Sequence, residues 1–162
     1  MRLTEIKVVW NLTKPLPNLR LNEKVVVKAV RKDQLVEVGK ILVITWGGFI
    51  KDPETTVKWV GPKLELGLEQ PFIAYLDDSP VGTVCPLLDR ESQSGRLDGG
   101  VHVLPEHRRQ YIGTTLLMTA LKWLKDHGMG EAWVTPWNAE GEGAIERATA
   151  FYVSSGGTIR EE

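Results

Sequence analysis

The clearest pattern in the chain is an apolar stripe with helical spacing that begins near Gly113. The stripe consists of Leu116, Leu117, Ala120, Leu121 and Leu124. His127-Gly128 follows as a typical C-terminal cap, so the pattern predicts a helix with one buried face. A second helix is predicted over 143–155 and ends at Gly156-Gly157. Its expected buried positions are Ala144, Ile145, Ala148, Phe151 and Tyr152.

Runs of β-branched and other apolar residues predict the strands. These runs cover 23–32, 72–76, 81–87, 96–104, 131–137 and 158–160. Asp77-Asp78-Ser79-Pro80 has a turn composition, which predicts that the second and third runs form an antiparallel hairpin. The pair Gly99-Gly100 inside the fourth run predicts a bulge or a close approach of another backbone.

Two further helices are expected between the first and second runs. Asp33 is the expected cap of a helix whose apolar residues continue to Ile44. Asp52-Pro53-Glu54 is a second helix start, and Gly61-Pro62 is expected to kink or end that helix. The order of elements predicts an α/β domain with a mixed, mostly antiparallel sheet flanked by helices.

Composition and charge narrow the class of protein. The chain has 162 residues, with 20 Lys+Arg against 21 Asp+Glu, which fits one domain with its own core. The net charge of −1 gives no general attraction for nucleic acid or anionic lipid. The longest apolar stretch, 41–50, is too short to cross a bilayer, and Cys85 is the only cysteine. We therefore expect a cytoplasmic protein with no nucleic-acid or membrane partner. The three histidines are not spaced as metal ligands, so no metal is expected.

The segment 101–116 has the strongest chemical signal. A strand is followed by a short basic loop with Arg108 and Arg109, and a helix starts near Gly113. Unpaired N–H groups and the positive end of the helix dipole favour an anion at such a start. Gly113 lets a phosphate oxygen come close, and the hydroxyl of Thr114 or of the next threonine is a possible donor. The glycine patterns of P-loop and dinucleotide-binding proteins are missing.

These residues resemble the GNAT superfamily of N-acetyltransferases. The family signature, roughly V-x-P-x-x-R/Q-x-x-G-x-G/A, is matched here by Val103, Pro105, Arg108 and Gly113. Tyr111 stands where the first glycine of the motif would be. Tyrosine does not easily adopt a positive φ, so the loop is expected to take a conformation open to ordinary residues.

A second block, from Trp137-Asn138 to Gly156, also resembles the family, and the likeness spans roughly 24–160. The resemblance implies that Asn138 contacts the pantetheine arm of acetyl-CoA and that Tyr152 hydrogen-bonds the leaving sulfur. The coenzyme-binding residues that it implies are Val101, His102, Val103, Arg108, Arg109, Gln110, Tyr111, Ile112, Gly113, Thr114, Asn138 and Tyr152.

The implied reaction is direct transfer of the acetyl group of acetyl-CoA to a primary amine in a ternary complex. Backbone groups of the bulged strand would bind the pantetheine arm. An amine with a pKa near 10 must first lose a proton, so a general base is useful. Asp98 and Glu140 are the candidates, Asp98 being the one expected to be catalytic together with Tyr152, and His102 is a further candidate. Each has an ordinary alternative: Asp98 could be a solvated carboxylate, Tyr152 a core aromatic and His102 a strand residue without a catalytic role.

Several functional questions stay open at this point. A non-catalytic acyl-CoA-binding module of the same fold is the main alternative, and a protein-interaction domain without coenzyme is another. The acceptor could be a small amine, an amino acid, a polyamine, an antibiotic or a peptide N-terminus. Trp46 and Trp59 lie in the segment where the family builds its acceptor pocket, but they could equally be core residues.

The N-terminal extension, 1–23 of the single domain 1–162, contains a strand-like run over 5–12 and a proline-containing linker. By comparison with the family, the last strand is missing at the C-terminus. We therefore expect the N-terminal run to take its place, because an open sheet edge would favour aggregation or dimerisation. A homodimer stays open.

Overall fold

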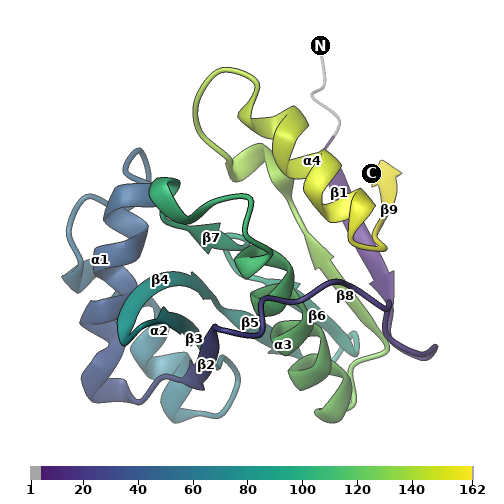
Figure 1. The fold of residues 1–162 in the computed structure, drawn as a ribbon. Coiled ribbons are helices and arrows are strands. Elements are labelled where there is room, and N and C mark those ends of the chain that lie inside the picture. The colour runs from purple at the N-terminus through teal and green to yellow at the C-terminus, as the bar shows by residue number, and fades with distance from the viewer. Residues whose placement is uncertain (1–4, 162) are drawn as a thin grey trace.

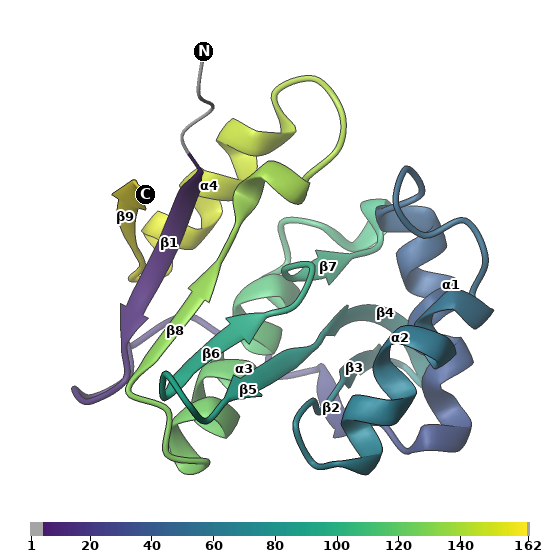
Figure 2. The same cartoon turned by 180° about the vertical axis from the view of Figure 1, so that it is seen from behind.

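The computed structural model describes residues 5–161, which form two β-sheets covered by helices (Figures 1 and 2). The strands are β1 (Ile6–Asn11), β2 (Val26–Ala29), β3 (Phe72–Leu76), β4 (Ser79–Val84), β5 (Pro86–Asp89), β6 (Ser94–Leu97), β7 (His102–Val103), β8 (Glu131–Val134) and β9 (Thr158–Glu161). The α-helices are α1 (Leu35–Thr45), α2 (Glu54–Glu65), α3 (Ile112–Asp126) and α4 (Ala144–Ser154). Short 3-10 helices are η1 (Lys32–Gln34), η2 (Pro105–His107) and η3 (Pro136–Asn138).

The predicted fold class is confirmed. One sheet has the strand order β5-β6-β8-β1-β9, and the other has the order β2-β3-β4-β7. Neighbouring strands are antiparallel except β6 and β8, which run parallel. The hairpin predicted at Asp77-Asp78 joins β3 to β4, and both aspartates have positive φ.

The chain passes between the two sheets at two strand breaks. Cys85 separates β4 from β5, and 98–101 separates β6 from β7, so the runs predicted as single strands over 81–87 and 96–104 are each two strands. Gly99 and Gly100 have φ of 77° and 88°, a conformation that glycine adopts without steric cost. The predicted irregularity is therefore a sharp turn. β6 pairs with β8, whereas β7 leaves β8 and pairs with β4.

Helices cover both faces of the molecule. α3 and α4 lie on the face seen in Figure 1, and α1 and α2 lie against the opposite face of the second sheet, as Figure 2 shows. The predicted stripe of α3 is fully buried in the larger core, with Leu116 and Leu121 both 0% exposed. A smaller core joins α1 and α2 to Ile73 of β3. Burial of these apolar faces is the main force that holds the layers together.

Three details of the helices were predicted wrongly or only as open alternatives. Asp33 lies inside η1, and Gln34 takes the cap position of α1. α2 does not end at Gly61-Pro62, which was one of the two outcomes expected there; it continues to Glu65, because Pro62 falls in the last turn, where the loss of one hydrogen bond is tolerable. Ile145, on the first turn of α4, is 40% exposed instead of buried.

The strand predicted for the N-terminal extension is confirmed, and it lies inside the sheet. β1 pairs antiparallel with β8 on one side and with β9 on the other. Val8 and Trp10 point into the larger core and are 0% and 3% exposed. The segment 12–25, which we call the strap, then crosses the outer surface of α3 on its way to β2 (Figure 1). Lys125 of α3 donates a hydrogen bond to the carbonyl of Lys14 in the strap.

Candidate active site

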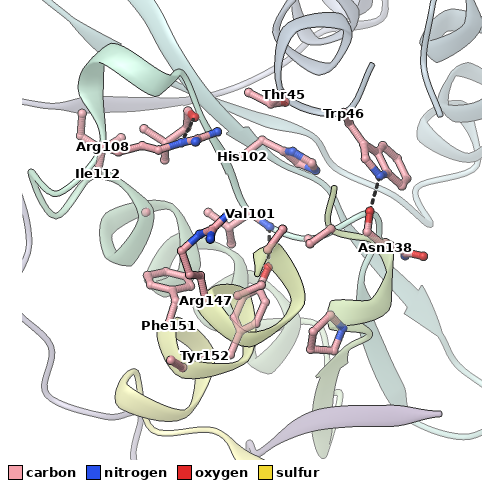
Figure 3. A pocket seen from close by; sticks show the side chains of 18 of the residues that line it. Thr45, Trp46, Val101, His102, Arg108, Ile112, Asn138, Arg147, Phe151 and Tyr152 are labelled. Atoms are coloured by element: carbon pink, nitrogen blue, oxygen red, sulfur yellow. Dashed lines mark hydrogen bonds between the residues drawn. The ribbon is translucent and has the colours of Figure 1, made fainter. Parts of the chain in front are cut away.

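A cavity of about 950 Å³ opens where β7 turns away from β8. Its walls come from the loop before α3, the first turn of α3, η3, α4 and the end of α1. Figure 3 shows side chains from these elements around a common space, among them Arg108, Arg147, Tyr152 and Trp46. All the residues predicted to bind coenzyme line this cavity except Gln110.

The start of α3 has the features of an anion site. The first N–H groups of an α-helix have no intrahelical partner, and Tyr111 at the cap position makes no side-chain capping bond. Arg108 and Arg109 line the same end of the cavity. Arg108 Nε donates to the carbonyl of Val103 at 3.1 Å, which ties the basic loop to β7. The dipole of the 15-residue α3 adds positive potential at this end.

The conformation expected for Tyr111 is wrong. Its φ and ψ are 62° and 18°, which is the left-handed region, and Arg109 has a φ of 63°. For an L-residue other than glycine this conformation costs about 1–2 kcal/mol. Tyr111, at the position of the motif glycine, therefore has the backbone conformation that favours glycine. Contacts elsewhere must offset the free-energy cost of that conformation.

The strap supplies such contacts. The guanidinium of Arg20 lies over the ring of Tyr111, 4.3 Å from the centroid, and Arg20 also donates to the Tyr111 hydroxyl at 3.3 Å. Asn22 Nδ2 donates to the carbonyl of Gln110 at 2.8 Å. The strap thus holds the two residues before α3 from the outside. The Gln110 carbonyl thus faces the strap, and Gln110, which was predicted to bind coenzyme, does not line the cavity.

The threonine hydroxyls at the start of α3, which were predicted as possible phosphate donors, bind protein atoms in the described structure. Thr114 Oγ1 lies 2.8 Å from the carbonyl of Arg20 and 3.0 Å from that of Tyr111, and its single proton is donated to one of them or shared between them. Thr115 Oγ1 donates to the Tyr111 carbonyl at 2.7 Å and accepts from the Asn22 amide at 2.9 Å. Both hydroxyls therefore stabilise the loop and the strap.

Tyr152 lies at the other end of the cavity, at the turn made by Gly99 and Gly100. Its side chain is 4% exposed, and its hydroxyl accepts a hydrogen bond from the Val101 amide at 2.9 Å. A Cβ at position 100 would come within 2.7 Å of this hydroxyl, so Gly100 makes room for it. Burial raises the pKa of Tyr152 to about 12. The Val101 amide is thus bound to Tyr152, whereas the family resemblance implied that backbone groups of Val101 and Val103 would bind the pantetheine arm.

Because its oxygen accepts from Val101, the Tyr152 hydroxyl can still donate its own proton. Among the strands of residues 5–161, β7 is an edge strand that pairs with β4 alone, and its other edge is on the side of the cavity. The arrangement places a neutral hydroxyl donor beside an open strand edge.

The candidate bases lie in three different places. His102 Nε2–H donates to the Gly99 carbonyl at 2.7 Å, and burial lowers the pKa of His102 to about 4, so its ring is neutral. Glu140 is exposed and lines the mouth of the cavity. Asp98 does not line the cavity; it pairs with Arg96 at 3.1 Å and lines a second, smaller cavity beneath α2. The structure therefore does not bring Asp98 together with Tyr152, because the turn at Gly99 directs it elsewhere.

Asn138 lies in η3. The N-cap position of the following helix, α4, is occupied by Gly143 and not by Asn138. The Asn138 carbonyl accepts a hydrogen bond from Trp46 Nε1 at 2.7 Å (Figure 3). This bond joins the end of α1 to η3 across the cavity. Trp46, for which the sequence left open an acceptor pocket or the core, lines both cavities.

Sequence reasoning missed Arg147 as a site residue. Arg147 lines the cavity from α4 and donates to the Glu142 carbonyl at 2.8 Å. Phe151 lies one turn later on the same face, and a Cβ at Gly113 would meet its ring at 3.2 Å. Gly113 thus allows α3 and α4 to approach each other. The i, i+4 spacing of Arg147 and Phe151 was the available signal.

Within residues 5–161, no group of three or more His, Cys, Asp or Glu side chains is arranged to hold a metal ion. None of the helices described there is both long and apolar enough to span a bilayer.

Comparison with known proteins agrees with this geometry. The family model described as "Acetyltransferase (GNAT) family" matches residues 35–152. The chain therefore belongs to the GNAT acetyltransferase family. A search of curated proteins gave no significant match.

Solved structures show the same fold at low sequence identity. A GCN5-related N-acetyltransferase from Sphaerobacter thermophilus is 17% identical with a TM-score of 0.67, over 98% of this chain and 49% of that one. One from Kribbella flavida is 17% identical with a TM-score of 0.60, over 90% of this chain and 53% of that one. The chain thus spans about half the length of these two proteins. The PaiA N-acetyltransferase from Thermoplasma acidophilum, solved with coenzyme A, is 16% identical with a TM-score of 0.54, over 65% and 74% of the two chains.

Proposed function

We propose that the protein transfers the acetyl group of acetyl-CoA directly to a primary amine. The observation that carries this proposal is that one continuous cavity extends from the start of α3, with its features of an anion site, to the Tyr152 hydroxyl. The family supports an acyl-CoA ligand, and the Thermoplasma relative was solved with coenzyme A. A long molecule with phosphates at one end and a reactive sulfur at the other matches this layout.

The residues present fit the coenzyme. The N–H groups of the first turn of α3, with Arg108 and Arg109, would hold the diphosphate. The free edge of β7 and the side chain of Asn138 would face the amide groups of the pantetheine arm. Arg147 adds a third cation to the lining. The volume of about 950 Å³ lies at the upper end of the range of ordinary ligand pockets, as a ligand of this length requires.

Bound coenzyme supplies an acetyl thioester, whose acetyl group passes to the amine nitrogen as the C–S bond breaks and the thiol gains the proton that the nitrogen loses. Tyr152 would hydrogen-bond the leaving sulfur. Its pKa of about 12 lies roughly 3.5 units above that of a thiol, so full proton transfer would cost about 5 kcal/mol. Tyr152 therefore acts as a hydrogen-bond donor and not as an acid that gives up its proton.

Removal of a proton from the attacking amine falls to water or to Glu140. His102 is a weak base because its pKa is about 4, and Asp98 is held in ion pairs with Arg96 and Lys63. Glu140 is exposed at the cavity mouth, where a carboxylate can accept a proton through water.

The experiment is an amine panel with acetyl-CoA and a thiol reagent that detects released CoA. Amine-dependent release of CoA, with the N-acetylated product seen by mass spectrometry, is the expected result. CoA binding without turnover of any amine would contradict the transferase and support the binding module of the same fold.

A further inference from the structure

A second cavity of about 390 Å³ lies between α1, α2 and the strand that leads to Asp98. It adjoins the coenzyme cavity, because Trp46 lines both and because the chain passes from one lining to the other between Asp98 and Gly99. One part of its wall is apolar, from Leu42, Trp46, Ile50, Trp59 and Val60. The other part is polar and charged, from Thr56, Lys63, Arg96 and Asp98.

The charged side chains beside this cavity have a net positive charge. Asp98 pairs with Arg96 at 3.1 Å and with Lys63 at 3.6 Å. Glu69 lies behind it, 1% exposed, and its pKa is raised to about 9, first by burial and then by the negative charge of Asp98. At neutral pH Glu69 is therefore uncharged, so two cations face one carboxylate. Lys63 Nζ is 3.6 Å from Asp98 and 3.7 Å from Glu69, too far for either to be a hydrogen bond.

Donors without protein acceptors lie at the same place. Thr56 is 1% exposed and lines the cavity, yet its hydroxyl has no hydrogen-bond partner in the described structure. Arg96 Nε, which is buried, likewise has none among the described residues. Buried polar groups are nearly always satisfied by protein atoms or by water. These two atoms have almost no accessible surface, so a ligand oxygen in the cavity would instead meet the partly exposed side chains of Lys63 and Arg96.

We propose that this cavity binds the acceptor of the proposed transfer, and that the acceptor is an amine carrying a carboxylate and an apolar body, such as an apolar amino acid. The carboxylate binds beside Lys63 and Arg96. The apolar body packs against Trp59 and the apolar wall, and the amine lies toward Trp46 and the turn at Gly99. A polycation is disfavoured, because it would meet Lys63 and Arg96 without a matching excess of carboxylates. This inference rests on the proposed acetyl transfer.

The test compares each amino acid with the amine that lacks only its carboxyl group. Leucine is paired with 3-methylbutylamine, phenylalanine is paired with phenethylamine, and spermidine represents polycations. We expect kcat/KM to be at least tenfold higher for the amino acid of each pair. The Lys63→Met variant should bring the ratio within a pair close to one. Lys58→Met, an exposed lysine on the same helix, is the matched control and should leave the ratio unchanged.

Binding is measured separately from turnover. The same pairs are titrated in the presence of CoA, and stabilisation is followed by thermal denaturation. Equal or better use of the decarboxylated amines, or a Lys63→Met ratio equal to that of the parent, would overturn the inference while leaving the transferase intact. If neither amino acid stabilises the protein in the presence of CoA, the inference is overturned, whether or not turnover is seen. Failure of CoA itself to stabilise the protein would instead contradict the proposed function.

Discussion

The left-handed conformation of Tyr111 leads to a prediction about how coenzyme affinity is set. Its cost of about 1–2 kcal/mol is matched by two contacts from the strap. The Arg20 guanidinium over the exposed ring contributes about 0.5–1 kcal/mol, and the Asn22 hydrogen bond contributes about 0.5–1.5 kcal/mol. The cost of the left-handed conformation and the summed energy of the two contacts are similar. Loss of one contact should therefore leave the loop in its binding conformation only part of the time.

The perturbation is Arg20→Ala in two backgrounds, with Tyr111 intact and with Tyr111→Gly. In the first, loss of up to about 1 kcal/mol should raise the Kd for CoA about two- to fivefold. In the second, glycine adopts the left-handed conformation without help, so Arg20→Ala should change the Kd less than twofold. Arg90→Ala, an exposed arginine between β5 and β6, controls for the change in total charge.

Isothermal titration calorimetry with CoA measures all four Kd values. An equal rise in both backgrounds would refute the reasoning, because it would mean that Arg20 acts on the coenzyme directly or through its charge. Tyr111→Ala is the complementary variant: it loses the ring but keeps the backbone cost. It should therefore bind CoA more weakly than Tyr111→Gly.

Three further predictions concern the fold and the reaction. Val8→Ala should lower the free energy of unfolding by about 2 kcal/mol and the Tm by several degrees. Val9→Ala should have a smaller effect, because Val9 is less buried. Equal effects of the two substitutions would contradict the inserted position of β1. Tyr152→Phe should lower kcat about 10- to 10,000-fold with little change in the Kd for CoA, and an unchanged kcat would remove Tyr152 from the mechanism. Between about pH 5 and 9 the native Glu69 keeps a proton that the unfolded chain has lost, so stability falls as pH rises. Urea unfolding at pH 5, 7 and 9 should show a weaker fall for Glu69→Gln, and parallel curves would contradict the raised pKa.

The sequence predicted the elements that depend on local pattern. The buried stripe of α3 and the turn at Asp77-Asp78 follow from helical spacing and turn composition, and both are confirmed. The irregularity at Gly99-Gly100 was also visible, but its direction was not. That direction decides that Gly99 lines the larger cavity and that Asp98 lines the smaller one, so Asp98 and Tyr152 do not line the same cavity.

The features that the sequence did not predict depend on contacts between distant segments. Tyr111 prefers ordinary backbone angles by itself, and it adopts a positive φ in contact with Arg20, 91 residues away along the chain. Glu69 follows an ordinary leucine and precedes a glutamine, with no motif around it. Its raised pKa arises only when folding buries it beside Asp98. Local preference contains no information about such pairs.

The central claim is that the first turn of α3 and the loop before it hold the diphosphate of coenzyme A. Titration of the isotopically labelled protein with CoA, followed by amide NMR, tests this most directly. We predict saturable shifts concentrated in 108–114 and at Val101. At about 100 times the Kd, the fold should gain about 2.7 kcal/mol, which would raise the Tm. Unchanged amides in 108–114, together with an unchanged melting curve, would contradict the claim.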